Sequence, residues 1–359
     1  MARIDWRALQ ASNQAAIARA GIAPREAIKL PPLAATPKGL PAAMPGLDRF
    51  SRFGHGDRAL VHVPPGLDPA TPAPLVCMLH GCTQDPASFA AATLMNDAAD
   101  RHEFVVVYPG QDRGANPRGC WNWFRPEHQR RDAGEPAAIA EIVRGLIERN
   151  SPCTVDPGRV FVAGLSAGGA MAAILAACYP DLFAAVAVHS GLAYSSATSL
   201  SSAFDVMARG DGNADDQGRA AHAAMGDHAR PVPSIVIHGN ADHSVNPANA
   251  INVLRQSMIA NDLAALETCH HDVAHPTTSW RGQADGGHPY TQSRWTEGDG
   301  ALMHELLEID GLGHAWSGGS AGSAHTDPRG PCATEMIWTF FGLTKFSGCR
   351  VGAGSGPAA

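Results

Sequence analysis

Short apolar runs recur along the chain, and each has the length of a buried β-strand. The first, 58–63, alternates between apolar and polar positions, which predicts an early strand at the edge of a sheet. The later runs are almost continuously apolar, as is typical of strands that are covered on both faces. They occupy residues 75–79, 104–108, 160–163, 184–188, 234–238 and 302–309.

Between these runs, apolar residues return three and four positions apart, as in amphipathic helices. Residues 135–149 show this spacing most clearly, and further helices are predicted over 87–101, 167–177 and 334–341. Strands that alternate with helices predict an α/β fold with a mostly parallel sheet flanked by helices. In such sheets, ligands bind at the carboxyl ends of the strands.

The same patterning divides the chain into parts. We expect an N-terminal helix and a Pro/Ala-rich linker over residues 1–48, one α/β catalytic domain over 49–345, and a flexible tail over 346–359. Within the domain, 192–231 and 268–300 show little periodicity and are too long for plain connections. We therefore expect these two segments to be inserted loops that form a small cap over the site.

One strand–turn–helix junction carries a candidate nucleophile. The run 160–163 is followed by GLSAG at 164–168, which fits the pattern G-x-S-x-G around Ser166. In this context the pattern is typical of a nucleophile elbow, where the turn holds the serine in a strained conformation and small neighbours avoid collisions. The alternative is a Gly/Ser-rich turn that has no chemistry.

Two further residues that follow predicted strands complete a candidate catalytic triad. A serine needs a base to accept its proton, and that base needs an orienting carboxylate. The order Ser166, Asp242, His314 is the chain order of the α/β-hydrolases, and His314 lies in a glycine-rich loop. In the alternative, Asp242 caps a turn or helix and His314 is an ordinary loop histidine. Asp310 is a second candidate acid, but it is too close to His314 in the chain for the usual arrangement.

Attack of Ser166 on an ester creates an oxyanion, which needs two N–H donors. We expect the first donor to be the N–H of Ala167, the residue after the nucleophile. The second should come from the loop after 75–79, where the N–H of Cys82 is our candidate. His80 in that loop is expected to support the loop rather than to act as a base.

Three tryptophans lie in loops near the proposed site: Trp121, Trp123 and Trp316. Core packing is the ordinary role of a tryptophan. Contact with an apolar acyl group or polymer is the alternative, and it makes the three residues candidates for substrate binding.

Composition and charge narrow the class of protein. Among 359 residues, 45% are apolar and 17% are charged, which allows a sizeable core. A net charge of −7 without a basic run argues against a nucleic-acid partner. No apolar run approaches the roughly 20 residues of a transmembrane segment, and the N-terminus lacks a signal-peptide core. We therefore expect a cytoplasmic location, or a secreted or periplasmic one if a leader was removed.

The eight cysteines show no CxxC or Cys/His spacing typical of zinc, so we predict no metal site. We also predict no cofactor, because the proposed serine chemistry requires none. Two pairs are candidate disulfides, Cys82 with Cys120 and Cys332 with Cys349. A cytosolic location would disfavour both pairs, and the spacing alone leaves the question open.

Five motifs follow one another along the chain: HGCTQ at 80–84, GCWNWF at 119–124, GLSAGGAM at 164–171, HGNADHSVNP at 238–247 and GLGHAWSGG at 311–319. Together they resemble the motifs of the poly(3-hydroxybutyrate) depolymerase family of serine esterases. The resemblance covers about residues 45–345. This region is similar to the type I catalytic domain of that family and is related to feruloyl and acetylxylan esterases.

The resemblance implies an α/β-hydrolase fold and assigns catalysis to the three residues of the candidate triad. It implies oxyanion donors at Cys82 and Ala167, and a disulfide from Cys82 to Cys120 that joins the oxyanion loop to the aromatic loop. The sequence shows neither the signal peptide nor the C-terminal substrate-binding domain of the secreted depolymerases. This difference favours amorphous granules, oligomers or small esters over crystalline polymer.

We predict a serine carboxylester hydrolase that cleaves short 3-hydroxyacyl esters through an acyl-enzyme on Ser166. The preferred substrate is poly(3-hydroxybutyrate) or its oligomers, and the expected partners are a polyester or small ester and a granule surface. A feruloyl or acetylxylan type of esterase acting on plant polysaccharide is the first alternative. A non-catalytic granule-associated protein is the second.

Overall fold

The computed structural model describes most of the predicted α/β domain. The predicted N-terminal helix and linker, 1–48, and the predicted tail, 346–359, lie outside the described residues. The structure describes residues 50–53, 58–149, 153–210, 213–265 and 272–344.

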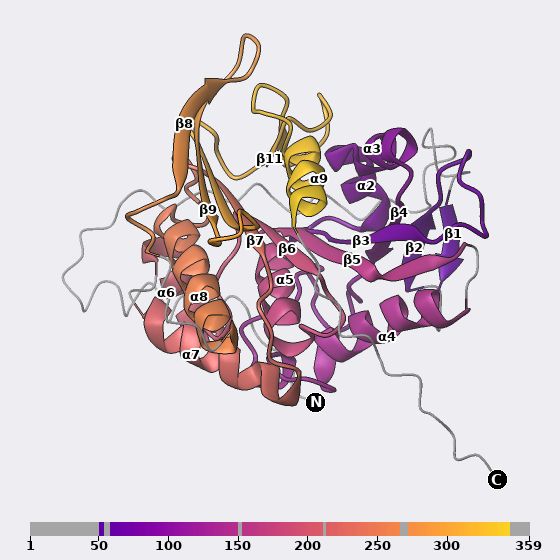
Figure 1. The fold of residues 1–359 in the computed structure, drawn as a ribbon, viewed down its shortest axis with the longest axis horizontal. Helices are drawn as coiled ribbons and strands as arrows, with labels where there is room; N and C mark the ends of the chain where they lie inside the picture. The colour runs from indigo at the N-terminus through magenta and orange to yellow at the C-terminus, as the bar shows by residue number, and fades with distance from the viewer. Residues whose placement is uncertain (1–49, 54–57, 150–152, 211–212, 266–271, 345–359) are drawn as a thin grey trace. The chain divides into compact units, whose positions relative to one another are not determined.

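A long sheet forms the centre of this structure (Figure 1). Its strands are β1 (Phe50–Phe53), β2 (Ala59–His62), β3 (Ala73–Leu79), β4 (Val105–Pro109), β5 (Val155–Leu165), β6 (Ala185–His189), β7 (Ser234–Gly239), β8 (Thr278–Gln283), β9 (Pro289–Thr296) and β10 (Leu302–Ile309). Within the described residues, these strands follow the order β1-β2-β4-β3-β5-β6-β7-β10-β9-β8. The strands from β4 to β10 in that order are parallel, and the pairs at both ends are antiparallel. A separate short pair joins β11 (Trp316–Ser317) to β12 (Thr326–Asp327).

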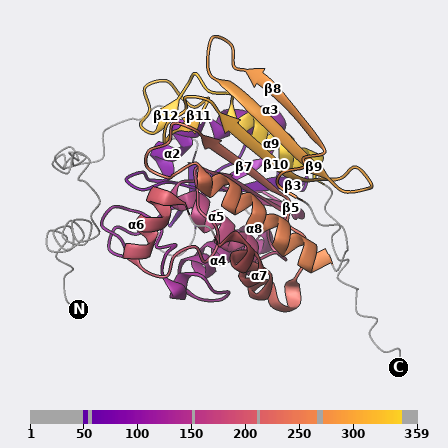
Figure 2. The same ribbon diagram turned by 90° about the vertical axis from the view of Figure 1, so that its left-hand side faces the viewer.

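Helices cover both faces of the sheet (Figures 1 and 2). The helices are α2 (Pro86–Thr93), α3 (Met95–His102), α4 (Gly134–Arg149), α5 (Ala167–Cys178), α6 (Leu200–Arg209), α7 (Ala214–Met225), α8 (Ala248–Ala265) and α9 (Ala333–Leu343), with 3-10 turns η2 (Pro126–His128) and η3 (Gly226–His228). One core lies between the sheet and α2, α3 and α9, and the other lies under α4, α5, α7 and α8. The predicted α/β-hydrolase architecture, a mostly parallel sheet flanked by helices, is confirmed.

Alternate side chains of the central strand β3 enter opposite cores. Cys77 and Leu79 pack in the core of α4 and α5, whereas Val76 and Met78 pack in the core of α2 and α9. All seven residues of β3 are buried as a result. Burial on both faces explains why the strand reads as a continuous apolar run in the sequence.

Two predicted elements differ in detail from the observed ones. The run 58–63 forms β2, but β2 is not the edge strand, because β1 pairs with it on the outside. The helix predicted over 87–101 is divided into α2 and α3 at Leu94, whose φ is 57°. A residue in this left-handed region cannot continue a right-handed helix, and nothing in the local apolar spacing signals the break.

The two segments that we expected to be loops contain regular structure. The segment 192–231 forms α6 and α7, and α7 packs largely through small residues, which give little contrast between its faces. The segment 268–300 contains the hairpin of β8 and β9, which pairs with β10 and extends the sheet (Figure 2). Most of β8 is exposed, so its sequence shows no buried face. Both segments therefore contain helices or strands and are not loops throughout, while their role as a cap over the site stays a prediction.

Helix α5 starts in direct backbone contact with the ends of two strands. A Cβ atom on Gly168 would lie 2.0 Å from the carbonyl oxygen of Leu79 and 2.7 Å from that of His80. A Cβ atom on Gly164 would lie 2.3 Å from the carbonyl carbon of Gly168. Only glycine fits at either position, so these contacts set the place where the chain turns from β5 into α5.

Substitution Gly168→Ala should therefore disturb both stability and the adjacent loop. We expect the free energy of unfolding to fall by about 3 kcal/mol, because the new methyl group overlaps backbone atoms that cannot rotate away. Urea unfolding followed by circular dichroism measures the change. Gly342→Ala in α9 is the matched control, since nothing lies within 4 Å of its added Cβ. Equal stability of the two variants would contradict the contact.

Candidate active site

Ser166 occupies the junction of β5 and α5 in a strained conformation, with φ 58° and ψ −119°. Residues with a side chain rarely adopt a positive φ, so the surrounding structure must hold this one in place. Part of that restraint is a hydrogen bond of 2.9 Å, which the Ser166 N–H donates to the carbonyl of His189 at the end of β6. The predicted sharp turn is therefore present, and it places the side chain at the carboxyl edge of the sheet.

The three residues of the candidate triad form one chain of hydrogen bonds. The Oγ of Ser166 lies 2.9 Å from Nε2 of His314. The Nδ1 of the same ring lies 2.7 Å from Oδ2 of Asp242. With Nδ1–H donating to the carboxylate, Nε2 is free to accept the serine proton. The structure thus brings together side chains that are 148 and 72 residues apart in the chain.

The environment of Asp242 favours its ionised form. The carboxyl group is buried, which opposes ionisation, but hydrogen bonds from His238 and His314 outweigh burial and hold its pKa below the usual range. Its other oxygen, Oδ1, accepts the backbone N–H groups of Ser244 and Val245, each at 2.8 Å. A carboxylate that stays charged can orient the base and stabilise it when it becomes protonated.

The second candidate acid, Asp310, is engaged elsewhere. Its Oδ1 accepts a hydrogen bond of 2.8 Å from the side-chain amide of Asn240. The carboxylate next to His314 is that of Asp242, as the spacing argument expects.

Two buried histidines beside the triad were not singled out from the sequence. Nε2 of His238 lies 3.4 Å from Oδ2 of Asp242 and 3.0 Å from the carbonyl oxygen of Val245. His189 is the last residue of β6. Its carbonyl accepts the N–H of Ser166, and its Nε2 accepts the N–H of Ser317 at 3.1 Å. The sequence signal for His238 is its spacing of four residues from Asp242 in HGNAD. For His189 the sequence signal is only its place at the end of a predicted strand.

The predicted oxyanion loop lies next to the nucleophile. A Cβ atom on Gly81 would lie 3.6 Å from Cβ of Ser166, and the Gly81 N–H is bound by the side chain of Gln84 at 2.9 Å. Across the described residues, no protein group accepts a hydrogen bond from the N–H of Cys82 or of Ala167. Both predicted donors therefore remain available to a bound oxygen.

The disulfide between Cys82 and Cys120, which the resemblance implied, is confirmed. It joins the oxyanion loop to the aromatic loop, 38 residues further along the chain. The other candidate pair, Cys332 with Cys349, is not tested, because Cys349 lies outside the described residues.

The three tryptophans predicted to bind substrate are buried, and the structure corrects that prediction. Trp316 is 1% exposed, stacks on His189 with ring centroids 5.1 Å apart, and donates its indole N–H to Thr334. Trp121 and Trp123 are 3% and 5% exposed and belong to the core. Their loops lie near the site, but their rings point into the protein, so core packing accounts for them.

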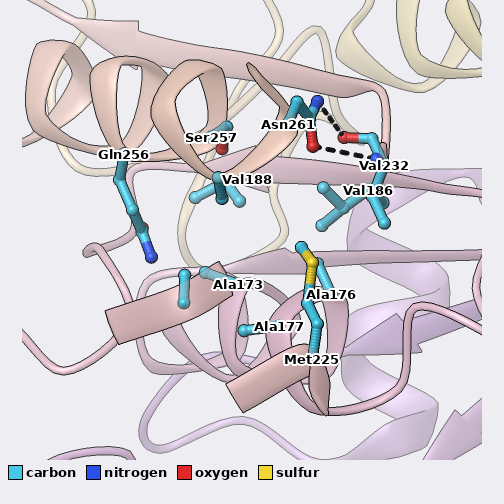
Figure 3. Close-up of a pocket in the computed structure, with 12 residues that line it drawn as sticks. Ala173, Ala176, Ala177, Val186, Val188, Met225, Val232, Gln256, Ser257 and Asn261 are labelled. Atoms are coloured by element: carbon cyan, nitrogen blue, oxygen red, sulfur yellow. Dashed lines mark hydrogen bonds between the residues drawn. The ribbon is translucent and has the colours of Figure 1, made fainter. Parts of the chain in front are cut away.

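A small pocket lies away from the triad, between α5, α7, α8 and β6 (Figure 3). Its walls are mostly alanine and valine side chains. Asn261 at one end exchanges hydrogen bonds of 2.9 and 3.0 Å with the backbone of Val232, and Gln256 accepts the N–H of Tyr194. Because these polar groups are already paired and no triad residue lines the pocket, we assign it to imperfect packing of the helices.

Neither a metal-binding cluster nor a membrane-spanning helix is found in the described part of the chain. No group of three or more His, Cys, Asp or Glu side chains is placed there to hold a metal ion. The helices seen in these segments are all too short or too polar to cross a bilayer.

Comparison with known proteins gives a consistent set of relatives. Residues 58–272 match the family model described as esterase PHB depolymerase, a range that contains Ser166 and Asp242. Poly(3-hydroxyalkanoate) depolymerase C of Paucimonas lemoignei is 35% identical over 83% of this chain and 70% of its own length. Feruloyl esterase B of Neurospora crassa is 30% identical over 65% of this chain and 79% of its own length.

Among solved structures, an acetyl xylan esterase from Aspergillus awamori superimposes with a TM-score of 0.61 at 21% identity. The match covers 80% of this chain and 94% of that one, and it supports the fold. Fold and relatives together define a carboxylic ester hydrolase of the α/β-hydrolase class. The chain belongs to the esterase PHB depolymerase family, since the family model spans more than half of it and the depolymerase matches most of it.

The buried His189 should make the protein sensitive to acid. Burial, followed by the charges of His238 and His314, lowers the pKa of His189 from 6.5 to about 3. Below pH 6.5 the unfolded chain binds a proton at this residue and the folded chain does not, so stability falls as the pH falls. Between pH 6 and 4 this one group should remove about 1.4 kcal/mol of unfolding free energy per pH unit.

Urea unfolding at several pH values measures this slope, and His189→Gln should make it shallower by that amount. The same substitution at the exposed His228 is the matched control. Identical slopes in the parent and in His189→Gln would contradict a neutral, buried His189.

Proposed function

We propose that this carboxylic ester hydrolase works through an acyl-enzyme on Ser166. The hydrogen-bond chain from Ser166 through His314 to Asp242, with steps of 2.9 and 2.7 Å, is the observation that carries the proposal. Its arrangement matches that of a serine nucleophile activated by a base whose orientation a carboxylate fixes. The proposed catalytic domain is 49–345.

In the acylation step, Oγ of Ser166 attacks the ester carbonyl while Nε2 of His314 takes the hydroxyl proton. The negative charge moves to the carbonyl oxygen, where the N–H groups of Cys82 and Ala167 donate to it. When the carbon–oxygen bond to the leaving alcohol breaks, His314 returns the proton to that alcohol. Throughout, Asp242 keeps Nδ1 protonated and stabilises the positive ring.

In the deacylation step, a water molecule replaces the alcohol and gives its proton to His314. The second tetrahedral intermediate uses the same two oxyanion donors. It collapses to release the acid and returns the proton to Ser166. The proton that Ser166 loses leaves with the alcohol, and a proton from water replaces it at the end of the cycle. The triad and the two N–H groups therefore account for the reaction.

The substrate that we propose is a short 3-hydroxyacyl ester, as in poly(3-hydroxybutyrate) or its oligomers. The support is the family description and the depolymerase of Paucimonas lemoignei, which is 35% identical. A granule surface in the cytoplasm is the partner that a polymer substrate implies. The alternative is a feruloyl or acetylxylan ester on polysaccharide, which the names of other relatives suggest.

Hydrolysis by the purified parent and by Ser166→Ala tests the proposal. With p-nitrophenyl butyrate, the variant should lose about 1,000-fold or more of kcat, because water and the remaining site cannot replace the nucleophile. The parent should also release soluble 3-hydroxybutyrate from amorphous poly(3-hydroxybutyrate) granules, and the variant should not. Ser201→Ala, on the exposed side of α6, is the matched control.

The outcomes separate the mechanism from the substrate. Parental activity in Ser166→Ala would contradict the acyl-enzyme on Ser166. It would mean that the hydrolysis does not depend on this serine. If the parent cleaves p-nitrophenyl butyrate but releases ferulate from a feruloylated sugar and nothing from granules, the nucleophile stands and the polyester assignment is wrong.

A further inference from the structure

The loop that carries Cys82 is held in place by a second loop in addition to its own internal hydrogen bonds. The disulfide to Cys120 ties the residue to that second loop covalently. The next residue, Thr83, donates its N–H to the carbonyl of Arg118 at 2.7 Å. The position of the Cys82 N–H therefore depends in part on how firmly residues 118–122 are fixed.

A buried carboxylate fixes this second loop. Glu135 lies in the first turn of α4, is 9% exposed, and accepts three hydrogen bonds. The backbone N–H and the side-chain amide of Asn122 donate to it at 2.7 and 2.6 Å, and the side-chain amide of Gln111 donates at 2.6 Å. That same amide of Gln111 also donates to the carbonyl of Cys120 at 3.0 Å. One carboxylate thus contacts the chain on both sides of the half-cystine.

The network reaches the oxyanion loop from another direction as well. The backbone N–H of Gln111 donates to Nε2 of His80 at 3.2 Å. The indole N–H of Trp121 donates to the carbonyl of His80 at 3.1 Å. The groups around Glu135 therefore hold the start of the oxyanion loop through His80 and its centre through the disulfide.

The charge of Glu135 is well placed for this purpose. A carboxylate at the first turn of a helix interacts favourably with the helix dipole, and hydrogen bonds to an ionised acceptor are stronger than those between neutral groups. If one of its oxygens were an amide nitrogen, at least one buried N–H donor of Asn122 or Gln111 would face another donor. Breaking such a bond leaves a buried polar group unpaired, so the loop would shift to reach water or another acceptor.

We propose that Glu135 is a positioning residue for the oxyanion hole, acting through Asn122, Gln111 and Cys120 to fix the N–H of Cys82. This inference rests on the proposed role of Cys82 in the function above. An oxyanion donor acts only when it points at the developing charge, so a displacement of a few tenths of an ångström weakens transition-state binding more than substrate binding. Glu135 touches no reacting atom and would affect the reaction through kcat.

The test is Glu135→Gln, which keeps the size of the side chain and removes its charge. With p-nitrophenyl butyrate, and with rates divided by the concentration of titrated active sites, kcat should fall about tenfold, less than the roughly 100-fold cost of losing an oxyanion donor outright. KM should change less than twofold. Titration of active sites with a fluorophosphonate counts only folded enzyme, so a loss of folded protein does not imitate the effect.

Two further variants sharpen the test. Glu141→Gln is the matched control, because Glu141 lies on the same helix with an exposed side chain, and it should keep the parental kcat. Gln111→Ala removes the bridge from Glu135 to Cys120 and should reproduce the loss in kcat with an unchanged KM. It remains informative if Glu135→Gln does not fold.

The affinity for a transition-state analogue separates a positioning role from a purely structural one, because loss of folded protein alone would not change it. An alkylboronic acid forms a tetrahedral adduct with the nucleophile, and one of its oxygens occupies the oxyanion hole. Its inhibition constant should rise in Glu135→Gln by the same factor by which kcat/KM falls. A kcat within twofold of the parent per titrated site, or a fall in kcat/KM with unchanged boronate affinity, would overturn the proposal.

These results are distinguishable from a failure of the proposed function. An active Ser166→Ala would remove the mechanism on which this inference depends. An inactive Ser166→Ala together with a fully active Glu135→Gln would remove only the role of Glu135.

Discussion

The close contact of α5 with the ends of β3 and β5 is the constraint on which the site depends. Because Gly164 and Gly168 have no Cβ atom, the helix starts directly against these strands, and Ser166 between them takes a positive φ of 58°. The turn brings the serine to the sheet edge, where the loops after β7 and β10 deliver the acid and the base. The same contact places the backbone of Leu79, and the loop that follows it, beside the nucleophile. One close approach therefore determines the relative positions of the proposed nucleophile and the proposed oxyanion loop.

The electrostatics of the site follow from what is buried around it. Asp242 is buried with enough hydrogen bonds to remain ionised, whereas burial keeps His189 neutral at ordinary pH. In the proposed mechanism, His314 becomes positively charged in the transition state. The negative charge of Asp242, which lies against the same ring, stabilises it. A second positive ring close to His314 would oppose that step. The burial that makes the fold sensitive to acid is thus the same burial that keeps His189 neutral and allows His314 to accept a proton.

Local patterns in the sequence were sufficient for the central fold and the order of the triad, but not for contacts between distant segments. The run 75–79 predicts its strand because both faces are buried, and the turn around Ser166 has a spacing that depends only on local sterics. The break at Leu94, the exposed hairpin of β8 and β9, and the inward direction of Trp316 are set by neighbours far along the chain. The three donors around Glu135 likewise come from loops that the sheet brings together, so no spacing in the sequence marks that residue.

The central claim, that Ser166 is the nucleophile of an acyl-enzyme, is tested most directly by covalent labelling. The enzyme would be treated with a fluorophosphonate, which reacts with activated serines, and examined by intact mass and by peptide mapping. The account predicts one adduct per chain, located on Ser166, with ester hydrolysis lost in proportion to labelling and no adduct on Ser166→Ala. Inactivation that accompanies labelling of a different residue, or full activity in enzyme labelled at Ser166, would contradict it.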